Sequence, residues 1–332
     1  MQKAFALLEE LQDGHAHSGE EIASKLGVTR TAVWNQIKRL QAEGVEIHAV
    51  SGKGYRLPGG YEFLNRHAIE LALGELSRSA INELRVDLVV DSTNQRLLDL
   101  IGGSDIHGLA WLAEYQTRGR GRRGGSWLAP PGSGLCLSLG WRFDAPLSSM
   151  SALSLVVGIA VVRALNQLGA KELSLKWPND IYHGERKLAG ILIEMRSEFG
   201  GPCTVAIGIG VNIALSKDAH ARINEIATDV SSACGFVPSR NKAAAGILDE
   251  LILVLRDFAH SGFDPYRSEW LRHDYLADRR ICLEMPERVV RGVARGVGAD
   301  GTLLIEHGGT TEAFLAGHIV MEADIDAADR RG

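Results

Sequence analysis

The apolar positions at the start of the chain follow first a helical and then a strand-like period. Apolar residues recur every three or four positions in three runs between residues 5 and 40, which predicts three short amphipathic helices. Ser18 and Thr29 stand where they can cap the second and third of these helices. The segment 44–57, GVEIHAVSGKGYRL, then alternates like two strands around a Gly-rich turn. Two helices about a glycine turn followed by such a hairpin predict a winged helix-turn-helix.

The polar side of the third predicted helix and the tip of the hairpin hold the candidate DNA contacts. Basic and acidic residues balance over positions 1–57, so we expect one copy to bind DNA weakly and a dimer on two half-sites to bind more tightly. On these residues alone, two alternatives stay open: a winged helix that contacts protein, and a polar face that is only solvated. The candidate DNA contacts are Arg30, Thr31, Asn35, Gln36, Lys38 and Lys53.

The middle of the chain has the pattern of a strand-rich domain with a buried helix. Segments 109–115, 135–141 and 188–195 are apolar and strand-like. The most apolar run, 153–165, contains Arg163 and is shorter than the roughly 20 residues that span a bilayer. We therefore expect this run to form a buried helix rather than a membrane span.

The last part of the chain alternates short strands and turns. This pattern begins near Arg279, and Asp300–Gly301 is a strong hairpin signal. It fits a small SH3-like β-barrel, which either only caps the fold or shares in binding ATP or an acceptor. The whole pattern predicts an α+β protein with three domains. Their expected boundaries are 1–62, 63–275 and 276–325.

Composition and charge narrow the class of function. The chain has 332 residues, 45% of them hydrophobic, so it can bury a sizeable core, which argues against global disorder. A formal net charge of −5 argues against general coating of polyanions but leaves room for a local basic site. The four cysteines form no CxxC, so we expect neither a zinc site nor a disulfide framework. With no signal peptide at the start, we expect a cytoplasmic protein that does not enter a membrane.

The stretch 114–134, EYQTRGRGRRGGSWLAPPGSG, concentrates positive charge. Gly119–Gly124 matches GxGxxG, but a dinucleotide turn needs a helix to open there, and Pro130 and Pro131 prevent one. A disordered RNA-binding tract is disfavoured because the stretch lies between two strand-like segments. Glycines let the backbone approach a ligand, and arginines bind phosphate or carboxylate. The loop is therefore predicted to close over an anionic ligand, with Trp127 as a flat face for a purine.

Three further patterns indicate binding in the same domain. The segment 91–94, DSTN, either only caps a helix or offers small donors and acceptors at the helix start. Lys176 alternates with buried strand positions, so it either meets an anion or lies on a solvent-facing side. Gly208 and Gly210 leave one face of a strand free of side chains, either for a flat ligand or for close helix packing. Asn212, at the end of that strand, can contact a base edge or a ribose.

Taken together, five motifs resemble biotin protein ligases: DSTN, GRGRRG followed by tryptophan, KWPND, KLAGILIE and IGIGVN, in this order. The winged N-terminus makes the chain similar to the bifunctional form, which also represses the biotin operon. The resemblance covers nearly the whole chain and implies a central domain with a mixed sheet like that of class II synthetases. It also implies that biotin and MgATP form biotinyl-5′-adenylate and pyrophosphate. Biotin then passes to a lysine of the biotin carboxyl carrier protein of acetyl-CoA carboxylase.

The resemblance assigns a role to each matching residue. Lys176 and Arg122 are the expected catalytic residues, because a cation beside the reacting groups offsets the negative charge that builds on phosphorus. Lys176 is expected to contact the biotin carboxylate and the α-phosphate, while Arg122 retains the adenylate. The implied biotin site contains Ser92, Thr93, Asn94, Gln116, Arg120, Gly121, Arg122 and Lys176. The implied adenylate and ATP site contains Arg120, Arg122, Trp127, Asn179 and Asn212.

The resemblance also implies partners and leaves alternatives. The adenylate is expected to order the loop and to favour a homodimer that binds operator DNA. The apo-carrier protein is expected to compete with the second copy by forming its own complex at a related surface. Gly125 and Ser126 stand where relatives commonly have basic residues, so we expect looser retention of the adenylate. The alternatives are a ligase whose winged helix does not repress, a transcription factor that only senses a ligand, and a lipoyl or octanoyl transfer enzyme of the related fold. The transcription factor could dispense with Lys176 and the loop arginines.

Overall fold

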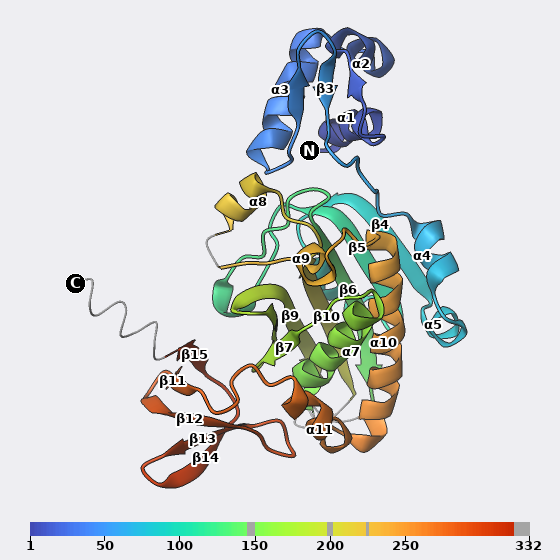
Figure 1. Cartoon of the computed structure of the whole chain (residues 1–332). Coiled ribbons are helices and arrows are strands. Elements are labelled where there is room, and N and C mark those ends of the chain that lie inside the picture. Colours follow the sequence, from blue (N-terminus) through green and yellow to red (C-terminus); the bar gives the residue numbers. More distant parts are fainter. Residues whose placement is uncertain (145–149, 198–201, 224–225, 322–332) are drawn as a thin grey trace, which may run out of the picture.

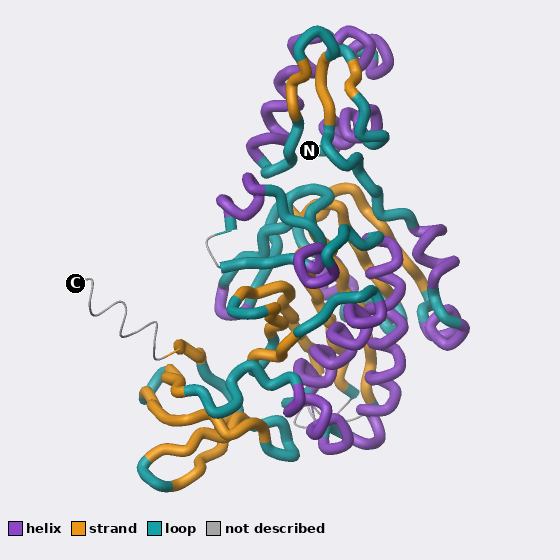
Figure 2. Tube along the Cα trace, in the orientation of Figure 1, coloured by secondary structure: helices purple, strands orange, loops and turns teal. Residues whose placement is uncertain are grey.

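The chain folds into three successive units, which Figure 1 shows in sequence colours from blue to red. A small helical unit lies at the N-terminal end, a large sheet covered by helices forms the middle, and a second small sheet follows. The fold is therefore α+β, as predicted. The N-terminal and central units contain both helices and strands, and the described elements of the C-terminal unit are strands (Figure 2). The computed structural model describes residues 1–144, 150–197, 202–223 and 226–321.

The N-terminal unit is the predicted winged helix-turn-helix. The Ser18 hydroxyl accepts the Glu21 N–H at 3.0 Å and the Thr29 hydroxyl accepts the Ala32 N–H at 3.2 Å, so both predicted helix caps are confirmed. Gly27 ends the second helix in the left-handed region (φ 63°), where glycine is favoured. The elements are α1 Gln2–Leu11, β1 Ala16–His17, α2 Gly19–Leu26, α3 Arg30–Ala42, β2 His48–Val50 and β3 Gly54–Arg56, with strand order β1-β3-β2.

The central unit is built on a seven-stranded mixed sheet with the order β4-β5-β6-β10-β9-β8-β7. Among the described strands of this sheet, only β4 and β5 pair in parallel, and the other neighbours are antiparallel. The predicted strands at 109–115, 135–141 and 188–195 are confirmed. The strands are β4 Glu83–Val90, β5 Leu109–Gln116, β6 Gly134–Phe143, β7 Leu173–Lys176, β8 Asp180–His183, β9 Arg186–Ser197 and β10 Cys203–Asn212.

Helices cover the sheet unequally, and this leaves room for a site. The run predicted as a buried helix forms α7 (Leu153–Gln167), which packs with α10 (Arg240–Ser261) on one face (Figure 1). The opposite face is covered in part by α6 (Thr93–Leu100), whose Leu97 contributes to a separate apolar cluster. Among the described residues, none of the helices combines the length and apolar character needed to cross a bilayer. The remaining helices are α4 Arg66–Ala72, α5 Glu75–Ala80, α8 Lys217–Arg222, α9 Val230–Cys234 and α11 Asp264–Arg272.

A buried ion pair attaches the linker after the winged unit to the central sheet. The Arg240 guanidinium lies 2.9 Å from the Glu114 carboxylate, and both side chains are almost fully buried. Tyr61, in the linker, donates its hydroxyl to the same carboxylate at 2.9 Å, while Arg240 Nε donates to the Gly134 carbonyl at 3.0 Å. Since each buried charge has partners, removing one of them leaves the other uncompensated. The pair holds the end of β5 and the start of β6 in place.

The winged unit also contacts the central unit through the end of α3. Arg222, at the end of α8, pairs with Glu43 at 3.1 Å. The Tyr115 hydroxyl of β5 donates to the same carboxylate at 3.1 Å, and the Ser216 hydroxyl donates to the Gly44 carbonyl at 2.9 Å. Figure 1 shows α8 between α3 and the sheet. The end of the predicted DNA-contacting helix α3 therefore contacts α8, the residue before α8 and strand β5 of the central unit.

The C-terminal unit is a five-stranded antiparallel sheet with the order β14-β13-β12-β11-β15. The hairpin predicted at Asp300–Gly301 is confirmed between β12 and β13, and its tip contacts the central unit where Trp177 Nε1 donates to the Gly301 carbonyl at 3.1 Å. The order places β14 and β15 at opposite edges of the described sheet, so closure into a barrel is not confirmed. The strands are β11 Arg280–Glu284, β12 Val289–Val297, β13 Leu303–His307, β14 Thr310–Phe314 and β15 His318–Met321.

Asp274, between α11 and the C-terminal sheet, makes stability depend on pH. Burial raises the pKa of its carboxyl from 3.8 to about 6, and its Oδ2 is buried without a hydrogen-bond partner in the part of the chain that the structure describes. The folded state therefore holds the proton more tightly than the unfolded state, and stability is lost as pH rises from about 4 through about 6. We expect Asp274→Asn, which keeps the Oδ1 that accepts the Leu276 N–H, to stabilise the protein at pH 7 by up to about 3 kcal/mol.

Urea denaturation of both proteins at pH 4 and pH 7 measures this effect. The two free energies of unfolding should agree at pH 4, where the native carboxyl is already protonated. An equal gain at both pH values, or a loss at pH 7, would contradict the assignment. Asp105→Asn is the matched control, because that carboxylate is exposed, pairs with Arg142 at 3.2 Å and does not act on Asp274.

Candidate active site

Two cross-strand rows on the α6 face form the floor of a cavity of about 430 Å³. In the first row, Gly210 of β10 pairs with Cys136 of β6 and Gly190 of β9. In the second row, Gly208 pairs with Ser138 and Leu192. Side chains at alternate positions of a strand share one face, so both rows open on the same side of the sheet. The glycines predicted to clear a strand face therefore lie in the middle of the floor.

The group that lies flat against Gly210 and Gly190 is the indole of Trp127, a side chain of the protein itself. A Cβ on Gly210 would lie 2.3 Å from Trp127 Cε2, and a Cβ on Gly190 would lie 3.3 Å from Trp127 Cζ3. The indole of Trp127 therefore lies directly on the first row. Its Nε1 is buried and has no hydrogen-bond partner among the described residues. A buried donor without a partner calls for an explanation, and a bound ligand or an ordered water molecule would provide one.

The second row supports a chain of polar side chains. A Cβ on Gly208 would lie 2.5 Å from Asn94 Oδ1, so this glycine makes room for Asn94. The Ser138 hydroxyl donates to Asn94 Oδ1 at 2.7 Å and lies 2.7 Å from the Thr93 hydroxyl. The Thr93 N–H donates to Gln116 Oε1 at 2.7 Å. Ser92 occupies the N-cap position of α6 without a side-chain capping bond, so capping alone does not explain the motif.

The Arg-rich loop closes one side of the cavity. Gly121 N–H donates to the Gly125 carbonyl at 2.7 Å and Trp127 N–H donates to the Gly119 carbonyl at 3.0 Å. The helical part of the loop is one 3₁₀ turn, Arg122–Gly124, which agrees with the exclusion of a dinucleotide fold. The backbone thus folds back on itself around the arginines.

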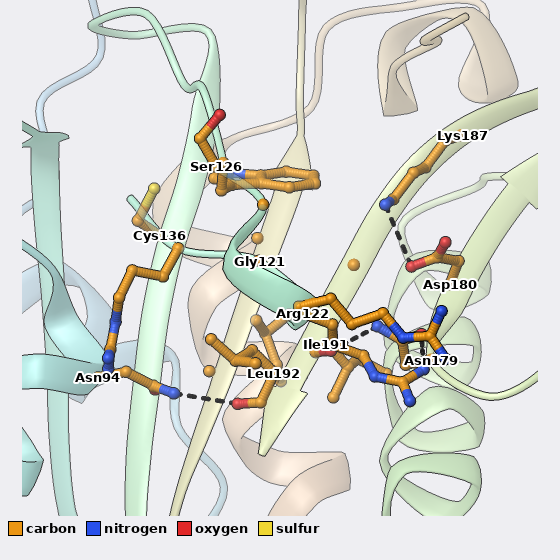
Figure 3. Close-up of a pocket in the computed structure, with 18 of the residues that line it drawn as sticks. Asn94, Gly121, Arg122, Ser126, Cys136, Asn179, Asp180, Lys187, Ile191 and Leu192 are labelled. Carbon is orange, nitrogen blue, oxygen red and sulfur yellow. Dashed lines mark hydrogen bonds and ion pairs between the residues drawn. The ribbon is translucent and has the colours of Figure 1, made fainter. Parts of the chain in front are cut away.

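Two loop arginines reach the strands across the cavity. Arg122 donates to Asn179 Oδ1 at 3.0 Å, and Asn179 Nδ2 donates to the Ile191 carbonyl at 2.8 Å (Figure 3). Arg120 pairs with Glu194 of β9, while its Nε is buried without a partner among the described residues. Guanidinium groups held in this way are suited to bind phosphate or carboxylate groups.

Two lysines line the same cavity. Lys176 of β7 points away from the buried Leu175, donates to the Tyr182 hydroxyl at 3.3 Å and lies 5.8 Å from the Tyr275 ring centroid. Lys187 of β9 lies 5.9 Å from the centroid of the Trp127 ring and pairs with Asp180 at 3.2 Å (Figure 3). We expected only Lys176. The KLAGILIE motif was visible, but nothing in its spacing indicated that Lys187 would face Trp127.

The structure brings the predicted small-molecule residues together. The cavity also receives residues that we did not predict, including Ser138, Lys187 and His318 of β15. His318 shows that the C-terminal sheet borders the cavity, which favours a share in binding over a purely structural role. Asn212 donates to the Thr228 carbonyl at 3.0 Å, so part of its amide is already engaged. The predicted residues that line the cavity are Ser92, Thr93, Asn94, Gln116, Arg120, Gly121, Arg122, Trp127, Lys176, Asn179 and Asn212.

The predicted DNA contacts do not all lie on one face of α3. Arg30, Thr31, Asn35 and Lys38 are exposed, and so is Lys53 of the wing. Trp34, 49% exposed, lies among them with Lys38 Nζ 5.9 Å from its ring centroid, and we did not predict it. At 100° per residue, Gln36 is about 160° round the helix from Lys38, and its Oε1 is buried without a hydrogen-bond partner among the described residues. Gln36 thus faces away from the surface that Lys38 and Trp34 share.

Comparison with known proteins finds matches for the N-terminal unit, for most of the central unit and for almost the whole chain. Residues 87–212 match the Biotin/lipoate A/B protein ligase family, and residues 3–56 match an HTH domain. The chain is 37% identical over 319 residues to the bifunctional ligase/repressor BirA of Salmonella typhimurium, covering 96% of this chain and 97% of that protein. It is 38% identical over 317 residues to BirA of Escherichia coli, covering 96% of each chain.

A solved structure supports the central fold. The biotin protein ligase of Aquifex aeolicus in complex with biotin and ATP superimposes with a TM-score of 0.62 at 27% identity. The match covers 73% of this chain and 99% of that one.

Proposed function

This chain belongs to the family of bifunctional biotin–protein ligases and repressors, and from that premise we propose how its residues divide the work. The protein is a biotin–protein ligase that uses ATP and a repressor that acts through its helix-turn-helix unit. One observation supports this assignment of residues: the same cavity is lined by hydroxyl and amide side chains, by the indole of Trp127, and by two lysines and two arginines.

Biotin binds against the polar wall made by Ser92, Thr93, Asn94 and Gln116. A cyclic urea needs both donors and acceptors, and this wall offers hydroxyl and amide groups of both kinds. The valerate carboxylate then extends toward Arg120 and the loop. The adenine of ATP lies near Trp127, whose Nε1 has no partner among the residues that the structure describes and is available as a donor.

Activation brings two anionic groups together. The biotin carboxylate oxygen attacks the α-phosphorus of ATP, the bond to the β-phosphate oxygen breaks, and pyrophosphate leaves. Lys187, Lys176 and Arg122 border the space where this charge develops, and fixed cations in a partly closed site stabilise the transition state. Mg²⁺ bound with ATP would offset phosphate charge, and the Asp180 carboxylate that lines the cavity would be one oxygen donor for it.

Transfer follows when the acceptor lysine reaches the adenylate. Its neutral amine attacks the acyl carbon, the amide bond forms and AMP leaves. The acceptor is the biotin carboxyl carrier protein of acetyl-CoA carboxylase. Arg122, held by Asn179, keeps the mixed anhydride in place until then.

Repression uses a homodimer that forms when the adenylate is bound. After Ile191, strand β9 is paired only with β10 among the described residues, so Leu192–Ser197 offers an open edge to a second copy. Glu43, at the end of α3, contacts Tyr115 of β5 and Arg222 of α8. Ile223, which follows Arg222, lines the cavity. A ligand in the cavity is therefore expected to alter the contacts of Arg222 with Glu43 that hold the DNA-binding unit against the central unit.

Labelled biotin, MgATP and apo-carrier protein test the enzymatic role. Transfer of label to the carrier is the expected result, with labelled lipoate giving none. Labelling by lipoate instead of biotin would reassign the protein to lipoyl transfer. Gel shifts and sedimentation with and without biotin and ATP test repression, and DNA binding that ignores the ligands would contradict the proposed linkage.

The exposed face of α3 should contribute to DNA affinity through phosphate contacts. Arg30→Ala combined with Lys38→Ala is expected to weaken operator binding and to reduce the slope of log K against log salt by about 2, since each lost phosphate contact removes about one counterion. Equilibrium binding at several salt concentrations measures the slope. Biotin ligation is the internal control and should not change. Gln36→Ala is the matched variant, and because Gln36 faces away from Lys38 its slope should equal that of the wild type.

A further inference from the structure

Glu194 of β9 joins two of the proposed biotin contacts. Its Oε2 accepts Asn94 Nδ2 at 3.0 Å and also accepts from the Arg120 guanidinium. Asn94 comes from α6 and Arg120 from the Arg-rich loop, so one carboxylate connects both walls of the cavity. Glu194 itself does not line the cavity. It acts on a ligand only through these neighbours.

The carboxylate fixes which way the Asn94 amide points. Asn94 Nδ2 donates to two acceptors, the Leu192 carbonyl at 3.0 Å and Glu194. A carboxylate only accepts, so a flipped amide would turn its oxygen toward two other oxygens. Oδ1 must therefore face Ser138, over Gly208.

The fixed amide then sets the protons of the two hydroxyl groups. Ser138 donates to Asn94 Oδ1 at 2.7 Å, so its oxygen is left to accept. The Thr93 hydroxyl, 2.7 Å from Ser138, gives its proton to Ser138 rather than to the more distant Gln116 Oε1 at 3.2 Å. The oxygen of Thr93, which lines the cavity, is then left to accept from a ligand. Hydroxyl groups alone allow either direction of the chain, and the carboxylate selects one.

We propose that Glu194 is a positioning residue that sets the donor and acceptor pattern of the biotin wall. The inference rests on the proposed binding of biotin at this wall. An acceptor at Thr93 suits a ring N–H of the cyclic urea, whereas a reversed chain would present a proton there. Glu194 thereby selects for a urea, which has two N–H donors beside one carbonyl acceptor.

The test is Glu194→Gln, which keeps size and shape but lets the amide of Asn94 flip. We expect the KM for biotin in adenylate formation to rise about 10–100-fold, the range for a hydrogen-bonded charged group, with kcat changed less than threefold. The decisive readout is biotin methylated on the ring nitrogen whose N–H would meet Thr93, because this analogue lacks the donor for which the wall is proposed to select. The ratio of its KM to that of biotin should fall at least tenfold. Desthiobiotin keeps the urea, so its ratio should not change.

Ser138→Ala breaks the same chain in the middle and supplies a second variant. It should reproduce the loss of discrimination, and the double variant should add little to either single one. Glu75→Gln, the same change at an exposed position at the start of α5, is the control and should match the wild type. An unchanged ratio in Glu194→Gln, or equal changes for both analogues, would show that Glu194 only braces the fold and would overturn the proposal. A wild-type protein that adenylates no biotin would instead refute the proposed function itself.

Discussion

Replacing Lys187 by methionine is expected to slow adenylate formation by a factor of about 10²–10³ while the protein still folds. The ammonium group lies 5.9 Å from the Trp127 ring centroid and is held by Asp180 at 3.2 Å, on the strand that carries the cavity floor. Attack of one anion on another needs positive charge that is already in place. Methionine keeps most of the apolar length of lysine, so the main change is the loss of charge. Single-turnover release of pyrophosphate measures the step directly.

The same experiment on Lys176 decides between the two lysines. Lys176 was the residue expected from the sequence, and its amine lies against Tyr182 and Tyr275 instead of Trp127. We expect Lys176→Met to have the smaller effect on adenylate formation. A large loss in Lys176→Met with none in Lys187→Met would return the catalytic role to Lys176. Lys171→Met, at an exposed position before β7, serves as the control for a lost surface charge.

Gly210→Ala is expected to raise the KM for ATP at least tenfold and to leave the KM for biotin nearly unchanged. A Cβ at this position would lie 2.3 Å from Trp127 Cε2 and 2.6 Å from its Nε1, which is closer than real contacts allow. Because the indole must move, the proposed adenine site loses its stacking face, which contributes about 1–3 kcal/mol in base–aromatic contacts. Steady-state kinetics with each substrate varied in turn separates the two constants.

Gly208→Ala is the matched variant in the next row of the floor. Its Cβ would lie 2.5 Å from Asn94 Oδ1, so it should raise the KM for biotin and spare ATP. The two changes are chemically identical and two residues apart on β10. Equal effects of both variants on both substrates would contradict the division of the cavity into a biotin side and an adenylate side.

Local patterns predicted much of the fold correctly. The caps at Ser18 and Thr29 depend on contacts three residues apart, and the hairpin at Asp300–Gly301 on adjacent residues. The burial of α7 follows from an apolar run that has no polar face. Such features are visible in a sequence because the interacting groups are neighbours along the chain. The positions of the domain boundaries stay predictions.

The site could be predicted only as a set of motifs. Trp127 was assigned to a purine face, but only strand register places it on Gly210, 83 residues later. Ser138 was missed because a serine inside a strand is common, and Glu194, although it ends the KLAGILIE motif, was given no role because the motif does not show what its carboxylate contacts. They matter because pairing sets Ser138 opposite Gly208 and because α6 brings Asn94 between them.

The amino-acid sequence by itself determined the helices and hairpin of the winged unit, the central strands of the large sheet and the buried helix α7, and it showed that cationic and small polar groups are concentrated in the central domain. Those outcomes depend on periodicity and on side-chain chemistry, which are local. The tertiary structure alone decided that Lys187 joins Lys176 at the cavity, that Gln36 turns from the DNA-facing side of α3, and how α3 meets α8. Each of these depends on groups distant in sequence or on the orientation of one packed element against another, and no local pattern of residues encodes them.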